Sequence, residues 1–125
     1  MAFTTGIIVN GGVYGNTAAS YTLSISNESL VNGATIQMHA FYVNNLLIRE
    51  PLYQFVFFVP ANTIDLRNFS VFGFIGYEVQ YQATTPTPNE VVATVFALDI
   101  NGNLIANQKA LQSEMTFLPQ LTPIP

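Results

Sequence analysis

Hydrophobic and polar residues alternate with a period of two along much of this chain, as they do in strands that bury one face. Tyr21, Leu23 and Ile25 alternate with hydroxyl side chains, and residues 36–42 and 77–82 repeat the pattern. The alternation therefore predicts a strand in each of these segments.

Other apolar segments are also predicted to be strands, at residues 46–48, 54–59, 63–66 and 69–75. Residues 54–59 are apolar on both faces, which predicts a central strand covered by a second layer or by a neighbouring subunit. Gly73 interrupts the last segment, and a glycine inside a strand usually marks a bulge or a close approach.

The firmest hairpin signal is the pair Asn101-Gly102, because both residues tolerate the positive φ angles of a tight turn. This pair predicts that residues 91–98 and 103–107 are neighbouring strands. Residues 107–115 fit either one or two helical turns or a further strand, so both interpretations stay open.

The spacing of these segments predicts about eight to ten short strands in an all-β, single-domain antiparallel β-sandwich of the jelly-roll kind. We expect residues 20–116 to form the sandwich domain. Residues 1–19 are predicted to be an N-terminal arm or a first strand, and residues 117–125 a proline-rich C-terminal tail. Proline holds such a tail extended, so it is more suited to a groove than to the middle of a sheet.

Both ends of the chain carry apolar side chains that could join subunits. We predict that residues 3–9, or failing those residues 117–124, leave their own domain and complete the sheet or groove of a neighbour. The alternative is that the first strand pairs within its own sandwich. The candidates for the subunit interface are Phe3, Ile7, Ile8, Val9, Phe117, Leu118, Leu121 and Ile124.

Charge is scarce in this sequence, and its scarcity favours association. Only 8% of the residues are charged while 50% are hydrophobic, and the formal net charge is -4. A surface with so little charge resists self-association poorly. We do not expect nucleic acid as a partner, because the chain has no cluster of basic residues that could bind phosphates. The absence of cysteine excludes disulfides and thiolate zinc sites.

The sequence presents no catalytic constellation, and we expect neither an enzyme nor a cofactor or metal site. His39 is the only histidine and has no recognisable second ligand or nucleophile elbow, so we expect a structural role for it. Two neighbouring pairs, Asp65 with Arg67 and Arg49 with Glu50, are interpreted as solvated strand-end charges or as ion pairs that specify a subunit contact.

The aromatic content suggests an alternative function, a glycan-binding surface on which tyrosine rings stack against sugar rings. The candidate rings are Tyr14, Tyr42, Tyr53, Tyr77 and Tyr81. Each of them fits the core of a sandwich or an interface equally well.

No segment approaches the ~20 apolar residues of a membrane helix, so we expect no membrane insertion. Residues 1–6 lack the basic and apolar regions of a secretory leader. If the protein acts outside the cell, we expect release by lysis of the cell that made it.

The C-terminal half of the chain carries a resemblance to a known group of proteins. The matching segments are Tyr77-Glu78-Val79-Gln80, residues 91–96, residues 99–106 and residues 111–115. They resemble small surface proteins of spore-forming Firmicutes, which are similar to the jelly-roll subunits of endospore appendage fibres.

The resemblance implies a subunit that assembles into a fibre or layer with copies of itself, on a spore surface or outside the cell. Other surface proteins and glycans are further partners that it would allow. Appendage subunits cross-link through cysteines in an N-terminal connector, and this chain has no cysteine. We therefore expect non-covalent joints. Besides a carbohydrate-binding or adhesin module, a viral capsid or spike jelly-roll protein is an alternative.

Overall fold

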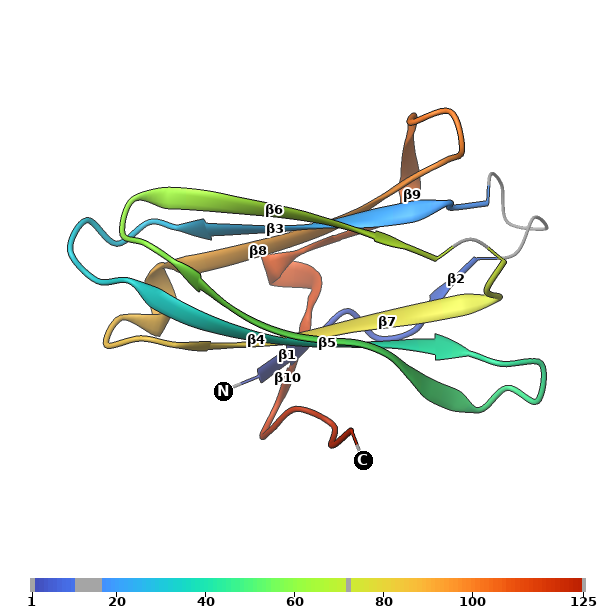
Figure 1. Cartoon of the computed structure of the whole chain (residues 1–125), viewed down its shortest axis with the longest axis horizontal. Helices are drawn as coiled ribbons and strands as arrows, with labels where there is room; N and C mark the ends of the chain where they lie inside the picture. The colour runs from blue at the N-terminus through green and yellow to red at the C-terminus, as the bar shows by residue number, and fades with distance from the viewer. Residues whose placement is uncertain (1, 11–16, 72, 125) are drawn as a thin grey trace.

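The computed structural model describes residues 2–10, 17–71 and 73–124 and shows two antiparallel sheets that face each other (Figure 1). The prediction of an all-β sandwich is confirmed. The six-stranded sheet has the order β10 (Thr116–Leu118), β1 (Ala2–Thr4), β7 (Gly76–Thr84), β4 (Ala34–Val43) and β5 (Arg49–Val59), with β2 (Ile8–Val9) also paired to β7. The four-stranded sheet has the order β6 (Thr63–Ser70), β3 (Ser20–Asn27), β8 (Val91–Leu98) and β9 (Leu104–Leu111).

The chain crosses between the sheets from β3 to β4, from β5 to β6, from β6 to β7 and from β7 to β8, whereas β4–β5 and β8–β9 are neighbours within one sheet. Strand β3 pairs with β6 and β8 in one sheet, while β4 pairs with β5 and β7 in the other. Short 3-10 helices, η2 (Pro88–Glu90) and η3 (Gln112–Glu114), precede β8 and follow β9. The two sheets therefore enclose one core between them.

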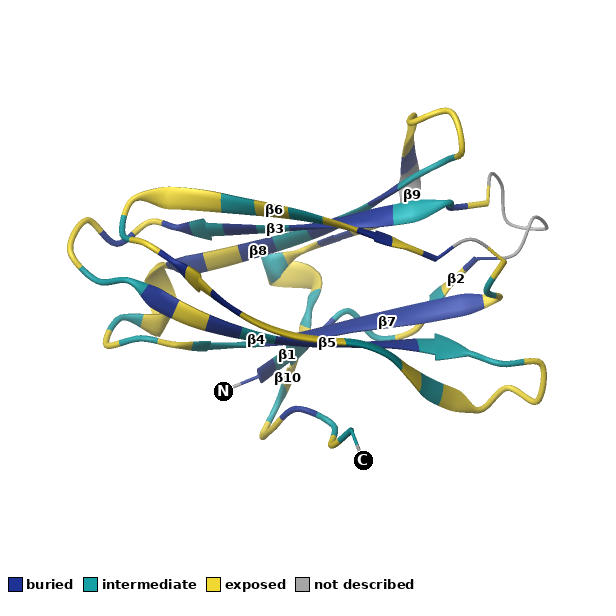
Figure 2. Ribbon diagram, viewed as in Figure 1, coloured by how far each residue is buried: buried dark blue, intermediate teal, exposed yellow. Residues whose placement is uncertain are grey.

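The core is built from the inward side of each alternating strand. Tyr21, Leu23 and Ile25 of β3 are fully buried, and the ring of Tyr21 stacks on Tyr77 of β7 at 5.4 Å between centroids. Strand β7 is buried along most of its length, as its dark blue colour in Figure 2 shows. The segments predicted at residues 21–26, 36–42 and 77–82 are confirmed as parts of β3, β4 and β7.

The predicted turn at Asn101-Gly102 is also confirmed, between β8 and β9. Gly102 has a φ of 83°, and the carboxylate of Asp99 accepts hydrogen bonds from the backbone N–H groups of Asn101 and Asn103. Residues 107–115 combine both interpretations, because β9 runs to Leu111 and η3 follows it.

Three strand predictions were wrong or only partly right. Residues 54–59 belong to β5, which is an edge strand rather than a central one. Residues 46–48 form a hairpin tip instead of a strand, because the Asn44 side chain accepts hydrogen bonds from the backbone N–H groups of Leu46 and Ile48. Strand β6 ends at Ser70, so residues 69–75 do not form one strand.

Candidate interaction surfaces

The edge strands β5 and β6 lie along the same side of the sandwich and are joined by the turn at residues 60–62 (Figure 1). Each has a single neighbour in its sheet, β4 for β5 and β3 for β6. Along its outer side, each therefore presents backbone N–H and C=O groups that could pair with another chain.

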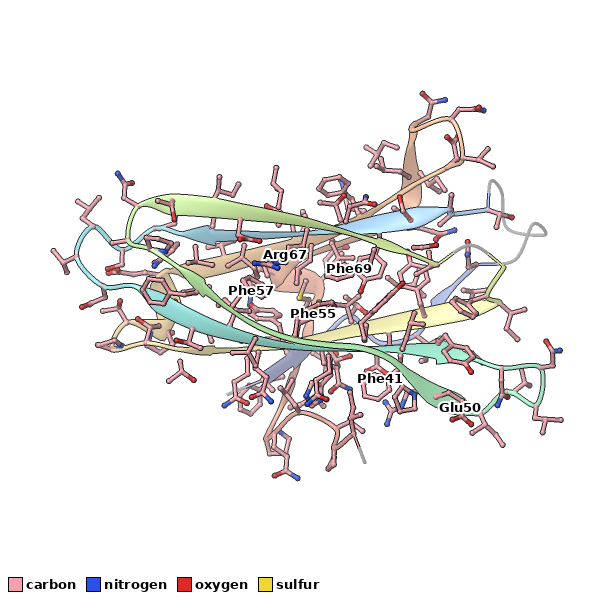
Figure 3. All side chains as sticks on the ribbon, viewed as in Figure 1. Phe41, Glu50, Phe55, Phe57, Arg67 and Phe69 are labelled. Carbon is pink, nitrogen blue, oxygen red and sulfur yellow. The ribbon has the colours of Figure 1, made fainter. Side chains whose placement is uncertain are left out.

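Side chains from both strands fill the space between them (Figure 3). The ring of Phe69 on β6 lies 5.2 Å from that of Tyr53 and 5.5 Å from that of Phe55, both on β5. Arg67 lies over the ring of Phe57, with its guanidinium carbon 3.8 Å from the ring centroid. These contacts close the core along this side of the sandwich.

The edge of β6 carries a charged pair that points between the sheets. Arg67 donates a hydrogen bond from Nε to Oδ1 of Asp65 at 2.9 Å. Inward-pointing charges on an edge strand discourage pairing with another chain, because such pairing would remove them from water. The two charges are thus an ion pair rather than separate solvated strand ends, and a role in a subunit contact stays a prediction.

Strand β5, by contrast, has an eight-residue stretch without inward charges, and its one register shift with β4 falls at Leu52, at the start of this stretch. Residues 52–59 contain no charged residue and no proline, and they lie between Pro51 and Pro60. On the outer face of this stretch Val56 is 65% exposed and Phe58 is 61% exposed. We call residues 52–59 the free edge.

The remaining described edges are shorter or irregular. Strand β10 has only three residues and Pro119 follows it. Strand β9 contains Lys109, and its register with β8 shifts between Phe96 and Ala97. Short edges, bulges and charges all hinder strand addition. The free edge of β5 is therefore the described edge best suited to pair with another chain.

The N-terminal segment lies in its own sheet in this single chain. Phe3 stands opposite Tyr81 of β7, and their rings stack at 5.5 Å between centroids. Ile7 and Val9 are exposed, while Ile8 is half-buried against the core. This arrangement corresponds to the alternative in which the first strand pairs within its own sandwich. A joint to a neighbour through these residues stays a prediction.

The C-terminal segment also packs on its own domain. Phe117 contacts the ring of Phe3 edge-on at 6.0 Å and remains exposed on its other side. Leu121 is buried, whereas Leu118 and Ile124 are half-buried. Of the proposed interface residues, Ile7, Val9 and Phe117 are thus the ones that the single chain leaves exposed.

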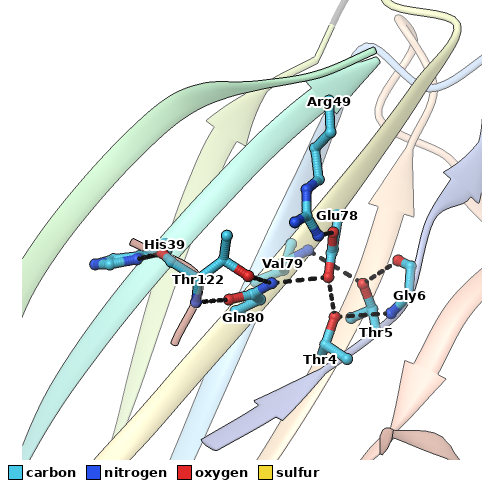
Figure 4. A network of polar contacts seen from close by, with 9 residues as sticks. All are labelled: Thr4, Thr5, Gly6, His39, Arg49, Glu78, Val79, Gln80 and Thr122. Carbon is cyan, nitrogen blue, oxygen red and sulfur yellow. Dashed lines mark hydrogen bonds and ion pairs between the residues drawn. The ribbon is translucent and has the colours of Figure 1, made fainter. Parts of the chain in front are cut away.

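A buried polar network fastens the N-terminal strand to the outer face of the six-stranded sheet (Figure 4). Glu78 is 4% exposed and accepts hydrogen bonds from Thr4 Oγ1, from Gln80 Nε2 at 2.9 Å and from Arg49 Nη1 at 2.7 Å. Burial alone would raise the pKa of Glu78. The hydrogen bonds from Thr4, Gln80 and Arg49, with the Arg49 charge, outweigh burial and lower this pKa.

The same network extends to the C-terminal tail, as Figure 4 shows. The Thr122 backbone N–H donates to Gln80 Oε1 at 2.8 Å, and Gln80 Nε2 donates to Thr122 Oγ1 at 2.8 Å. His39 Nδ1 lies 2.8 Å from the Thr122 carbonyl oxygen. Because a carbonyl only accepts, Nδ1 carries the proton in this contact. His39 therefore helps to hold the tail.

Sequence reasoning missed this network. Its signal was present in the outward positions of β4 and β7, where His39, Glu78 and Gln80 stand close to apolar neighbours. Nothing local indicated that Thr4 or Thr122 would meet them, since Thr4 and Glu78 are 74 positions apart. Arg49 pairs with Glu78 rather than with its neighbour Glu50.

The candidate tyrosines that the structure describes do not form a common exposed platform for sugars. Tyr77 and Tyr81 are buried, and Tyr14 lies outside the described residues. Tyr42 stacks on Phe74 at 4.5 Å, and Tyr53 belongs to the aromatic cluster between β5 and β6. The positions of these rings in the structure fit a role as core or contact residues better than a role in a glycan-binding surface.

A small hollow opens between the two sheets on the side opposite the free edge. Its volume is about 240 Å³, and Phe3, Tyr81, Val91 and Gln112 are among the residues that line it. The Tyr81 hydroxyl donates a hydrogen bond to the Gln112 side-chain oxygen at its wall. Within the described residues, no three or more His, Cys, Asp or Glu side chains gather as metal ligands. A helix long and apolar enough to cross a membrane is likewise not found in the described part of the chain.

The fold and these surfaces define the class of the protein as an antiparallel β-sandwich with a free strand edge. Comparisons with protein-family models, with curated proteins and with solved structures each found no match.

Proposed function

We propose that this protein is a structural subunit that self-assembles non-covalently into a fibre or layer, on a spore surface or elsewhere outside the cell. It acts in this proposal through its surfaces and performs no catalysis. The observation that carries the proposal is the free edge of β5, residues 52–59, with its exposed outer side chains Val56 and Phe58.

The free edge favours strand addition for two reasons. Its outer backbone groups gain hydrogen bonds when an extended segment of another copy pairs with them, over a length of roughly 27 Å for eight residues. Its side chains are apolar apart from Gln54 and the Tyr53 hydroxyl, so burial of Val56 and Phe58 adds to the same contact. Neither charge nor proline interrupts it.

The rest of the surface also favours assembly over a monomeric state. Only 8% of the residues are charged, so electrostatic repulsion between copies is weak. Leu30, Val31 and Leu46 are each more than three-quarters exposed in the loops at the ends of the sandwich. An uncharged edge and exposed apolar loops are unusual on a protein that remains dispersed.

The proposed location rests on the resemblance of residues 77–115 to surface proteins of spore-forming Firmicutes. The absence of cysteine excludes disulfide joints between subunits. Strand addition supplies a joint that requires no covalent bond.

Exchange of Val56 for lysine tests the proposal. The substitution V56K places a charge on the outer face of the free edge, at a side chain that is 65% exposed, so the fold should survive. The matched control is L46K, at a similarly exposed side chain on the hairpin tip. Light scattering across a dilution series and negative-stain electron microscopy report the assembly.

We expect the parent protein and L46K to polymerise, and V56K to form only small species. A parent protein that is monomeric at every concentration contradicts the proposed function. Polymers that survive V56K but disappear with L46K would move the joint from the free edge to the hairpin tip.

A further inference from the structure

The outer face of the four-stranded sheet is a second candidate surface, separate from the free edge, and it mixes small polar with large apolar side chains. Along β3, the side chains that point away from the core are all small hydroxyl residues. Larger side chains stand beside most of them on the neighbouring strands, except that Ser70 is beside Ser20 and Thr94 beside Ser24. The outward residues are Ser20, Thr22, Ser24 and Ser26 on β3, Ile64, Leu66 and Asn68 on β6, and Val92, Thr94, Phe96 and Leu98 on β8.

The difference in side-chain size makes a groove along β3. The register places Ser24 beside Leu66, and Thr22 between Asn68 and Phe96. Thr22 points outward yet is only 8% exposed, whereas Leu66 is 64% exposed. Asn68 covers one end of the row of small residues, because its side-chain N–H groups donate to Thr22 Oγ1 at 3.1 Å and to Ser20 Oγ at 3.3 Å. Toward the other end, Ser24 and Ser26 lie beside the larger Leu66 and Ile64. We call this feature the hydroxyl groove.

The outer faces of the two sheets differ in cover and in charge. On the six-stranded sheet, the tail contacts His39 and Gln80, and the Glu78–Arg49 ion pair lies beside them. On the four-stranded sheet, Lys109 of β9 is the only charged residue among the described outward side chains of the strands, and Glu28 beyond β3 accepts a hydrogen bond from outward Ser26. Ile64 stays 61% exposed. Outward residues of a sandwich are normally polar. Exposed apolar side chains among these outward positions, such as Ile64 and Leu66, are suited to a contact with another molecule.

We propose that this face stacks against the same face of a second copy of the chain. The inference rests on the proposed self-assembly and adds a second, independent contact to it. The free edge extends a sheet within its own plane, whereas stacking joins two sandwiches face to face. A subunit with both contacts can build a layer or a fibre that is more than one subunit wide, because the two contacts run in different directions.

A second copy is the occupant that the shape and size of the face favour. A second copy presents the same exposed apolar side chains, and such side chains interdigitate when two sheets stack. The exposed apolar residues of the face are Ile64, Leu66, Val92, Leu104 and Leu111. They offer roughly 500 Å² per copy, so their complete burial on both copies would remove roughly 1,000 Å², about the lower limit for a specific interface.

Charge sets the direction of the stack. Lys109 stands opposite Phe96, at the level of Thr22, whereas Glu28 follows the other end of β3. When the β3 strands of two copies run antiparallel, each Lys109 lies toward the end of the partner that carries Glu28. A parallel stack would instead bring like charges to the same end.

The test uses V56K as the background, since this substitution removes pairing through the free edge. Sedimentation velocity across a concentration series then measures the remaining association. We expect V56K to form a dimer, and the double variant V56K/L66K to raise the dimer dissociation constant roughly tenfold or more. The control V56K/L46K should dimerise as V56K does. V56K/I64K provides an independent change on the same face, and circular dichroism verifies the fold of each variant.

The outcomes separate this inference from the proposed function. If the parent polymerises but V56K is monomeric throughout, stacking is overturned while self-assembly through the free edge stands. If L66K and I64K both leave the V56K dimer intact, the contact lies on another face and the inference is also overturned. A parent protein that never forms more than a dimer sensitive to L66K would support stacking and contradict the fibre or layer.

Discussion

The guanidinium carbon of Arg67 lies 3.8 Å from the centroid of the Phe57 ring, although the two residues belong to edge strands of different sheets. Phe57 is buried beneath it, and Asp65 holds the guanidinium with a hydrogen bond of 2.9 Å. Arg67 thus covers the end of the core with its side chain while it keeps a charge on the edge of β6.

Replacement of Arg67 by alanine should lower the free energy of unfolding by about 1–2 kcal/mol, because the cation–π contact and the cover over Phe57 are both lost. The Asp65 ion pair adds little, since both partners are partly exposed. Urea unfolding measures the change. Replacement by methionine keeps the apolar cover and should cost less. Equal stability of the alanine variant and the parent would mean that the contact with Phe57 contributes nothing.

The lowered pKa of Glu78 predicts a dependence of stability on pH. A carboxyl group whose pKa is lower in the folded than in the unfolded protein stabilises the fold above its unfolded pKa, and this contribution disappears as the pH falls through the folded pKa. For Glu78 the loss should therefore begin below about 4.5, its ordinary value, and continue at lower pH.

The substitution E78Q should remove this dependence. At pH 7 we expect a loss of about 1–3 kcal/mol in the free energy of unfolding, because Arg49 loses its anionic partner and the buried site loses acceptors. The difference from the parent should shrink as the pH falls below 4.5. Urea unfolding at neutral and acid pH measures it, with E90Q on the exposed η2 as the control. A difference that stays constant with pH would show that Glu78 is not the group responsible.

Removal of residues 119–125 should leave the sandwich folded but less stable. The truncation removes the Thr122 hydrogen bonds to Gln80 and His39 and uncovers their side chains, at a cost of roughly 1–3 kcal/mol. Thermal unfolding by circular dichroism measures the loss, and T122A, which removes only the hydroxyl bond, should have a smaller effect. An unchanged unfolding temperature after truncation would contradict a role of the tail in stability.

Local patterns were sufficient for most of the strands. The alternation of Tyr21, Leu23 and Ile25 with hydroxyl residues predicted β3 because a period of two is a property of the strand itself. Asn101-Gly102 predicted its hairpin for a similar reason, since the φ of 83° at Gly102 is a local requirement of the turn.

Strand β5 shows where local patterns fail. A strand with apolar residues on both faces has the same sequence pattern in two situations. A second layer of the same protein can cover it, or it can contact another molecule. Val56 and Phe58 are exposed because they point to the outer face of the sheet and nothing in the described chain covers them there. The position of β5 at the edge follows from strand order, which depends on pairing between segments far apart in the chain. The sequence therefore predicted a central strand where the protein has a free edge.

The sequence by itself determined the all-β class, the positions of most strands, the low charge and the absence of disulfide joints, because these follow from composition and short-range periodicity. Only the tertiary structure decided which strands form the edges, where the hydroxyl groove lies, and how Thr4, Glu78 and Thr122 meet on one sheet. Such features depend on contacts between residues distant in the chain, and these form when strand order and register bring the residues together.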